Sequence, residues 1–170
     1  MLVVDDEELY RRALERILVR AGYEVYLARD ASEALGIVSS SKLDLVLCDV
    51  KMPGVSGLEL VRQIAELTPD LPSIVITGYG GAESSVEALK AGAFWYLEKP
   101  FEQEHLDVVR RLVKQAIEHG RLRKENRFLQ NQLRSRHKFD SIIGRSQALR
   151  QVLDVVEKVA DTDTTVLITG

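Results

Sequence analysis

The sequence is poor in residues that cross-link chains or bind soft metals. It has one cysteine and three histidines in 170 residues. A single cysteine, Cys48, excludes an internal disulfide bond, and the scattered histidines do not have metal-ligand spacing. The neighbours of Cys48 are apolar, and we therefore expect a buried thiol rather than a reactive one.

Long apolar runs are absent too. The sequence has no run of the roughly eighteen apolar residues that a membrane-spanning helix needs. The first residues, Met1 to Asp6, lack the basic and then apolar order of a signal peptide. We expect a cytoplasmic protein without a membrane partner. With 45% hydrophobic and 29% charged residues, the chain can form one domain of ordinary size and an appendage.

The net charge of −3 is unevenly distributed. Residues 1–104 have 10 Lys and Arg against 18 Asp and Glu, a balance of −8, whereas residues 121–138 have seven basic residues against Glu125 alone. A basic stretch can bind nucleic acid or an anionic membrane, but this one follows a helical pattern and has no aromatic residue beyond Phe128. We interpret it as the solvated face of a helical linker.

Five short apolar runs alternate with segments of helical period over the first hundred residues. Uninterrupted runs of this length are typical of strands buried on both faces of a parallel sheet. The alternation predicts an α/β fold, a five-stranded, doubly wound parallel sheet with helices on both faces. The expected strands are 2–4, 25–28, 43–48, 73–77 and 94–97. Gly22 is a typical C-cap for the first helix, and Asp30 with Glu33 has the spacing of a capping box for the second.

The helical pattern that starts near Gln103 continues into the charged stretch. We therefore expect a fifth helix that extends past its domain. Four of its residues recur at spacings of four, three and four, as the a and d positions of a parallel two-stranded coiled coil do. These seam residues are Leu122, Asn126, Leu129 and Leu133. We interpret Gly120 as an irregularity between two registers; the alternative to a coiled coil is a single helix that packs on its own domain.

The last part of the chain is typical of the beginning of another domain. A helical pattern over 149–156 is followed by the strand-like run 165–169. One buried strand without partners cannot form a domain, and we expect the chain to be part of a longer protein. The predicted division is a first domain over 1–103, a linker over 104–138 and a truncated domain over 139–170.

Polar side chains follow four of the expected strands, where the ligand site of an open parallel sheet lies. Asp5 and Asp6 follow the first strand, Asp49 the third, Thr77 the fourth and Lys99 the fifth. Three converging carboxylates repel one another unless a cation lies between them. Oxygen ligands without histidine or cysteine indicate Mg²⁺, which phosphate oxygens often complete. Lys99 would supply a positive charge to an anion, and Thr77 a hydroxyl donor.

A metal ion, a carboxylate nucleophile, a lysine and a hydroxyl group are the parts that phosphoryl transfer onto an aspartate needs. Taken singly, each residue has an ordinary explanation, because aspartates cap helices, lysines are solvated and threonines are common in strands. Their placement at four strand ends favours a joint function.

These residues resemble the receiver domains of two-component response regulators, from Met1 to about Gln103. The matching segments are 3–7 (VVDDE), 49–54 (DVKMPG), 76–78 (ITG) and 97–101 (LEKPF). The resemblance implies a flavodoxin-like fold in which Asp49 is phosphorylated by a sensor histidine kinase. It also implies that a first strand starting at Met1 is a residue or two short.

The resemblance assigns the metal ligands. It implies that Asp6 binds Mg²⁺ directly, that Asp5 acts through water, and that the carbonyl group of Lys51 completes the shell together with Asp49.

The resemblance also assigns a switch. Thr77 and Lys99 match the family's switch hydroxyl and lysine, and Tyr96 matches the aromatic residue whose rotamer reports phosphorylation. The bond from Lys99 to Pro100 is cis in the family.

The remainder resembles NtrC-like, sigma-54-dependent transcription activators. The long fifth helix, the segment 139–146 (FDSIIGRS) and the segment 165–170 (TVLITG) resemble the junction into their AAA+ ATPase domain. Gly170 would open the phosphate-binding loop. The full-length parent would bind ATP, sigma-54 RNA polymerase and DNA. This chain lacks those parts, and we expect no enzyme activity from it beyond self-phosphorylation.

Three other functions share parts of the pattern. An aspartyl phosphatase of the haloacid dehalogenase type has the same sheet and magnesium, but it needs an acid–base aspartate where Lys51 stands. A nucleotide- or flavin-binding module would need a glycine-rich turn after the first strand, where the sequence is acidic. A third possibility is an interaction module with a vestigial acidic site, although every expected polar residue is present.

The signal is expected to leave the domain through the fifth helix. A change at Thr77 and Tyr96 would move elements beside that helix and so alter the surface that two protomers share. We expect a homodimer formed by this helix, the coiled coil and part of the receiver surface. The sequence leaves open whether phosphorylation strengthens or breaks the dimer.

Overall fold

The computed structural model describes residues 1–78, 82–99, 106–137, 146–159 and 167. Within this part of the chain, five strands and six helices follow one another. The strands are β1 (Leu2–Val4), β2 (Tyr26–Ala28), β3 (Val46–Asp49), β4 (Ser73–Thr77) and β5 (Trp95–Glu98). The helices are α1 (Glu8–Arg20), α2 (Ala31–Ser40), α3 (Gly57–Leu67), α4 (Ala82–Lys90), α5 (Leu106–His137) and α6 (Gln147–Val159).

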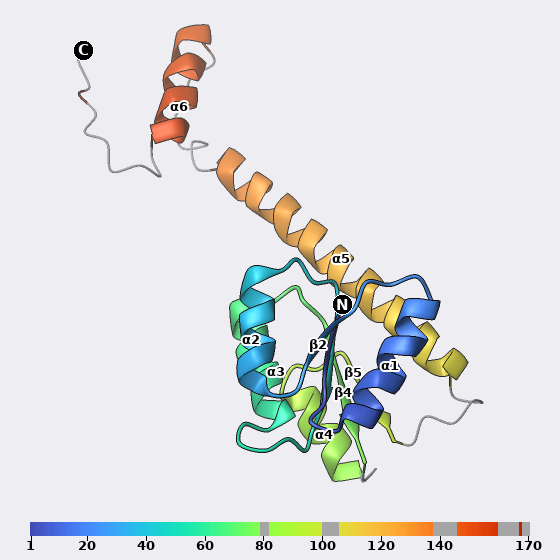
Figure 1. The fold of residues 1–170 in the computed structure, drawn as a ribbon. Helices are drawn as coiled ribbons and strands as arrows, with labels where there is room; N and C mark the ends of the chain where they lie inside the picture. The colour runs from blue at the N-terminus through green and yellow to red at the C-terminus, as the bar shows by residue number, and fades with distance from the viewer. Residues whose placement is uncertain (79–81, 100–105, 138–145, 160–166, 168–170) are drawn as a thin grey trace. The chain divides into compact units, whose positions relative to one another are not determined.

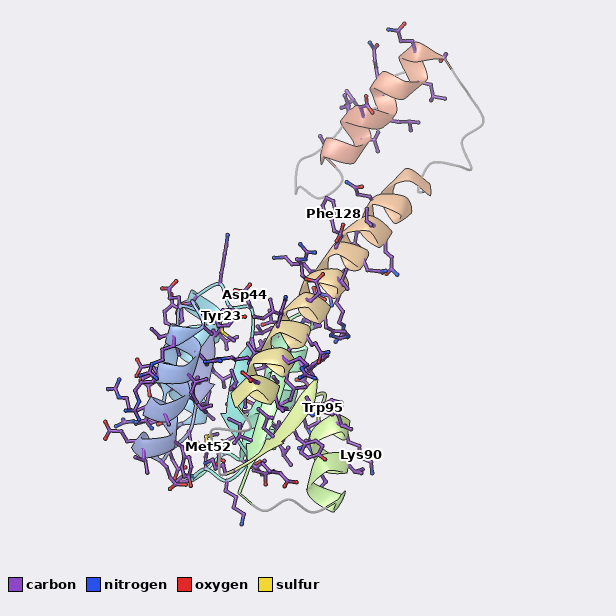
Figure 2. All side chains as sticks on the ribbon, turned by 90° about the vertical axis from the view of Figure 1, so that its right-hand side faces the viewer. Tyr23, Asp44, Met52, Lys90, Trp95 and Phe128 are labelled. Carbon is purple, nitrogen blue, oxygen red and sulfur yellow. The ribbon has the colours of Figure 1, made fainter. Side chains whose placement is uncertain are left out.

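The five strands form one parallel sheet in the order β2-β1-β3-β4-β5. Helices cover both of its faces, with α1 and α5 on one side and α2 and α3 on the other (Figure 1). The predicted five-stranded, doubly wound α/β fold is therefore confirmed. Asp44 precedes the central strand β3 and Met52 follows it, so these two labels mark the two ends of the sheet in Figure 2.

The strands are apolar because both of their faces are covered. One face packs Leu2 and Val4 of β1 against alanines and leucines of α2, α3 and α4. The other packs Val3 of the same strand against Leu14 of α1 and Val113 of α5. All three β1 residues are fully buried, and burying such a side chain contributes about 1.5–3 kcal/mol.

Two predicted helix ends are confirmed. Gly22 lies just past α1 with a φ of +88°, a conformation that favours glycine. The side chain of Asp30 accepts a hydrogen bond from the N–H of Glu33 at 2.9 Å. The carboxylate of Glu33 in turn accepts from the N–H of Arg29 at 3.0 Å, one residue earlier than in the usual capping box.

Some predicted bounds are wrong by a few residues. The third strand was expected over 43–48 but spans Val46–Asp49, because Asp49 still pairs with Ile76 of β4. The fifth strand likewise ends at Glu98, which pairs with Thr77.

Helix α5 is long and unbroken, as predicted, but the interpretation of Gly120 as an irregularity is wrong. Gly120 is helical and buried. A Cβ atom there would lie 2.7 Å from Cδ of Pro72 and 2.9 Å from the carbonyl oxygen of Asp70. The missing side chain therefore allows the helix to approach the loop before β4.

The chain divides into two compact units, Met1–Glu125 and Asn126–Gly170, and α5 crosses the boundary. The second unit contains α6, whose position agrees with the helical pattern over 149–156. The strand-like run 165–169 lies outside the described residues, apart from Leu167. None of the helices in the described ranges is long and apolar enough to cross a membrane.

Candidate functional site

Four neighbouring strands bring polar residues to one end of the sheet. Asp5 follows β1, Asp49 ends β3, Thr77 ends β4 and Lys99 follows β5. Asp5, Asp49 and Thr77 are buried. The chain order reverses direction between β1 and β3, which is where parallel α/β sheets place their ligand sites.

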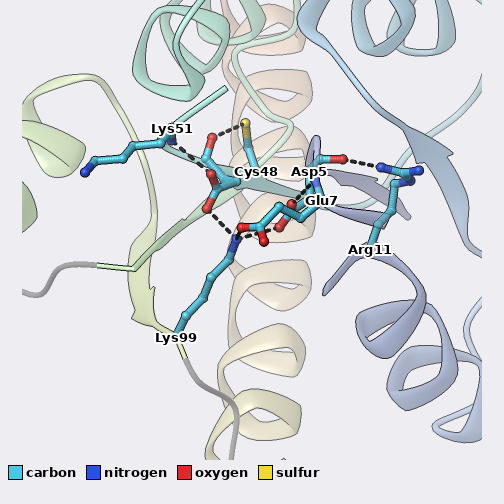
Figure 3. Close-up of polar contacts among 7 residues, drawn as sticks. Asp5, Glu7, Arg11, Cys48, Lys51 and Lys99 are labelled. Carbon is cyan, nitrogen blue, oxygen red and sulfur yellow. Dashed lines mark hydrogen bonds and ion pairs between the residues drawn. The ribbon is translucent and has the colours of Figure 1, made fainter. Parts of the chain in front are cut away.

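The ammonium group of Lys99 lies between two buried carboxylates (Figure 3). Its Nζ is 2.8 Å from Oδ2 of Asp5 and 2.9 Å from Oδ1 of Asp49. A third acid, Glu7, lies at 3.7 Å. The Lys99 side chain is only 7% exposed, so water screens these charges weakly. Three carboxylates therefore surround one ammonium group.

Burial and charge act against each other in this cluster. Burial raises the pKa of Asp49 above its ordinary value, and hydrogen bonds from Lys99 and the Lys51 N–H offset this only in part. Burial alone would lower the pKa of Lys99, but its contacts with Asp5 and Asp49 outweigh burial and raise that pKa. The lysine is therefore charged at neutral pH, and the two acids can accommodate further positive charge.

The backbone around Asp49 is fixed from two directions. The N–H of Lys51 donates a hydrogen bond to Oδ2 of Asp49 at 3.0 Å, and the N–H of Val50 donates to the carbonyl of Ile76 at 2.8 Å. From the other direction, α3 begins at Gly57, where a Cβ atom would lie 1.8 Å from the carbonyl oxygen of Asp49. Only glycine fits there, so the start of α3 packs directly on the backbone of Asp49.

The first turn of α1 holds Asp5. The N–H of Glu7 donates to Oδ1 of Asp5 at 2.9 Å, and the guanidinium of Arg11 donates to the Asp5 carbonyl. The buried Oδ2 atom accepts no well-aligned hydrogen bond from the described residues, and its contact with Lys99 is an ion pair. Such an oxygen is suited to binding a cation.

The chemistry of the donors fits a hard divalent cation. Asp5 and Asp49 direct carboxylate oxygens at one positive charge, and Asp6, the residue after Asp5, is exposed. Oxygen ligands of this kind are those that Mg²⁺ prefers. Among the described side chains, no three of His, Cys, Asp or Glu form a group that could hold a metal ion, and Lys99 stands between the two buried acids.

The two predicted switch residues lie on adjacent strands. The buried Thr77 ends β4, and its carbonyl accepts a hydrogen bond from the N–H of Lys99 at 2.8 Å. This bond ties the position of Lys99 to β4. Tyr96 of β5 is half-buried and stacks on Trp95, with ring centroids 6.2 Å apart.

The predicted seam residues lie on α5. Leu122 and Leu129 are 52% and 50% exposed, and Asn126 is exposed as well. The side chain of Leu133 lies outside the described residues, as does Pro100 and therefore the predicted cis bond. The coiled coil stays a prediction.

Sequence reasoning did not single out four residues that the structure places at this site. They are Glu7, Tyr10, Arg11 and Gly57. The ring of Tyr10 lies under Lys99, 4.3 Å from Nζ to the ring centroid. Glu7, Tyr10 and Arg11 could have been found from their position just after Asp5, and Gly57 from a glycine directly after the cap Ser56.

This geometry suits attack by the Asp49 carboxylate on an anionic electrophile. Lys99 can neutralise the approaching oxygens.

Residues 1–111 match the family of response regulator receiver domains. The chain is 38% identical over 172 residues to the C4-dicarboxylate transport transcriptional regulatory protein DctD of Pseudomonas aeruginosa. It is 36% identical over 172 residues to the nitrogen assimilation regulatory protein NtrX of Azorhizobium caulinodans. Each alignment covers 100% of this chain and 36% of the relative, so the chain spans about a third of the length of these curated relatives.

Solved structures of receiver domains and of an NtrX protein resemble this chain as well. The solution structure of the beryllofluoride-activated NtrC4 receiver domain dimer is 37% identical with a TM-score of 0.64, covering 70% of this chain and 96% of that one. The crystal structure of NtrX from Brucella abortus is 34% identical with a TM-score of 0.67, covering 95% of this chain and 34% of that one.

Proposed function

The chain belongs to the family of response regulator receiver domains, and on that basis we propose that Asp49 is its phosphoryl acceptor. The observation that carries the proposal is the position of Lys99, whose ammonium lies 2.9 Å from Asp49 and 2.8 Å from Asp5. Receiver domains are phosphorylated by histidine kinases, and a sensor kinase is the proposed donor here.

In the proposed reaction an oxygen of Asp49 attacks the phosphorus of a phosphohistidine. The new O–P bond forms as the P–N bond breaks, and the imidazole leaves with the electron pair. Lys99 neutralises the oxygens that approach Asp49, and the hydroxyl of Thr77 donates a hydrogen bond to one of them. The Lys51 N–H fixes the second oxygen of Asp49 and so orients the first.

Receiver domains bind Mg²⁺ for this step. We propose that Asp5, Asp6, Asp49 and the carbonyl group of Lys51 hold the ion here. When bound, Mg²⁺ supplies positive charge to the transferring phosphoryl group. Lys99 would then move from Asp5 toward the phosphoryl oxygens, which a flexible four-carbon side chain permits.

The test is phosphorylation of the 170-residue chain by acetyl phosphate with and without Mg²⁺, followed by intact-mass measurement. We expect one phosphoryl group per chain in the presence of Mg²⁺ and none for Asp49→Asn. The matched control is Asp44→Asn, at an exposed aspartate before the same strand, which should be phosphorylated like the parent. Undiminished phosphorylation of Asp49→Asn would overturn the proposal.

An aspartyl phosphatase is not favoured, because Lys51 occupies the position of the required acid–base aspartate and the family is one of receivers. A slowly hydrolysing acyl phosphate, without turnover of free phosphate esters, separates the two functions.

The proposed output runs through α5. NtrC-type receivers dimerise, and we propose that this chain forms a homodimer through α5 and the seam of Leu122, Asn126, Leu129 and Leu133. Phosphorylation would act on that dimer through Thr77 and Tyr96.

We propose the division into a receiver over 1–103, a linker over 104–138 and the start of an AAA+ domain over 139–170. The parent protein would bind ATP, sigma-54 RNA polymerase and DNA, and this part alone would not hydrolyse ATP.

A further inference from the structure

The ring of Tyr10 faces the ammonium group of Lys99. The distance from Nζ to the ring centroid is 4.3 Å, well within the approximately 6 Å over which an aromatic face attracts a cation. Tyr10 lies in the first turns of α1, whereas Lys99 follows β5. The contact therefore joins a segment from the beginning of the receiver sequence to a segment from near its end, at the acidic site. Tyr10 is half-buried and the side chain of Lys99 is only 7% exposed, so water weakens the attraction little.

The ring differs from the other neighbours of this ammonium group. Among the described residues, Asp5, Asp49 and Glu7 are the acids near Nζ. Under the proposed function, Asp5 and Asp49 exchange Lys99 for a metal ion and a phosphoryl group. The ring of Tyr10 takes part in neither exchange, and at 4.3 Å it leaves Lys99 room for a short shift toward the phosphoryl oxygens within the approximately 6 Å reach of the aromatic face.

We infer that Tyr10 is a positioning residue that holds the Lys99 ammonium beside Asp49 during phosphorylation. The inference rests on the proposed function of Asp49 and deepens it. With acetyl phosphate, an Asp49 oxygen attacks phosphorus, the O–P bond forms, the P–O bond to acetate breaks, and acetate leaves with the electron pair. Both reactants are anions, so a cation already in place lowers the barrier. Without the ring, the Lys99 side chain can adopt more rotamers, and the step slows.

The kinetic test compares ring-retaining and ring-removing variants of the 170-residue chain. The rate constant for phosphorylation by acetyl phosphate at saturating Mg²⁺ is followed by intact mass. Tyr10→Phe keeps the ring and should react within about twofold of the parent rate. Tyr10→Leu keeps apolar bulk but loses the aromatic face, and we expect a roughly three- to tenfold slower reaction. Tyr23→Leu, the same change at a tyrosine away from the site, should leave the rate unchanged.

A double-mutant cycle separates positioning from packing. In a Lys99→Met background, Tyr10→Leu should cause no further slowing, because there is no ammonium left to hold. An equal slowing in both backgrounds, or a Tyr10→Phe rate as low as that of Tyr10→Leu, would overturn the inference.

A second cycle does not depend on phosphorylation. Urea unfolding of the parent, Tyr10→Leu, Lys99→Met and the double variant should show that the double variant loses less stability than the sum of the single losses. If the losses of stability in the two single variants simply add up in the double variant, Tyr10 and Lys99 do not interact and the inference is wrong. If the parent is not phosphorylated on Asp49, the proposed function fails, and this cycle alone decides whether Tyr10 holds Lys99.

Discussion

Gly57 lies so close to Asp49 that a Cβ atom on Gly57 would stand 1.8 Å from the carbonyl oxygen of Asp49. The N–H of Gly57 also donates a hydrogen bond to the carbonyl of Val50 at 3.0 Å. The start of α3 thus packs directly on the backbone that carries the proposed phosphoryl acceptor. Any side chain at position 57 must move either α3 or the end of β3.

Gly57→Ala should therefore lower the free energy of unfolding by about 1–3 kcal/mol, the usual cost of forcing extra atoms into a packed core. Urea denaturation measures the loss. Gly36→Ala is the matched control, because Gly36 is an exposed helical glycine with no atom within 4 Å of the added Cβ. That variant should gain about 0.5–1 kcal/mol. If the Gly57→Ala variant is as stable as the parent, α3 can shift to accept the added Cβ atom without a loss in the free energy of unfolding.

Gly120→Ala tests how closely α5 approaches the loop before β4. Alanine normally stabilises a helix by about 1 kcal/mol relative to glycine, but here its Cβ would lie 2.7 Å from Cδ of Pro72. We expect the overpacking to cancel the gain and leave a net loss of roughly 1 kcal/mol. A gain as large as that of Gly36→Ala, measured in the same urea experiment, would contradict this packing.

Asp49→Asn should stabilise the fold at neutral pH. Burial raises the pKa of Asp49 in the folded chain, so the ionised carboxylate is less stable there than in the unfolded chain. The contribution of Asp49 to the free energy of unfolding is fully present below the ordinary aspartate pKa of 3.8, where its carboxyl is protonated. This contribution is lost as the pH rises through the pKa of Asp49 in the folded chain. The advantage of Asp49→Asn should be present at pH 7 and should fade below about pH 4.

Urea unfolding at the two pH values checks this, with Asp44→Asn at an exposed aspartate as the control. A less stable Asp49→Asn variant at pH 7 would mean that the ion pair with Lys99 outweighs the cost of burial.

Cys48 should not react with thiol reagents in the folded protein. Its side chain is fully buried, and burial, followed by the charges of Asp49 and Asp5, raises the pKa of the thiol. The reactive thiolate is therefore not formed at neutral pH. Ellman's reagent should detect no thiol in the native chain and one per chain in denaturant, since Cys48 is the only cysteine. Fast native labelling would show that the β3 region opens.

Leu129→Asp should weaken the proposed dimer. The change places a charge in the seam of each protomer, and burial of an unpaired charge costs more than the roughly 1.4 kcal/mol that corresponds to a tenfold change in affinity. Asn131→Asp adds the same charge two residues away, at a position outside the seam, and serves as the control. Sedimentation velocity should show at least about tenfold weaker association for Leu129→Asp only. If both variants associate like the parent, the linker is not the dimer element.

The sequence by itself determined where the strands and helices lie along the chain and the end of the sheet at which the site lies. Apolar runs and helical periods are local signals, and an open parallel sheet places its ligand site at the carboxyl ends of its strands. Asp5, Asp49, Thr77 and Lys99 could therefore be assigned to four strand ends from the sequence, whereas the order of those strands in the sheet came from the structure. The cap of α2 by Asp30 was equally accessible, because both partners lie within four residues of each other.

Only the tertiary structure decided how these groups meet. From the sequence, Gly120 looks like a weak point of a helix, whereas in the fold it is the place where α5 touches Pro72. Likewise, no local pattern shows that Lys99 lies between Asp5 and Asp49 and above the ring of Tyr10. These contacts join segments far apart in the chain, and they depend on the rotation of each helix about its axis, which close packing of the whole core sets.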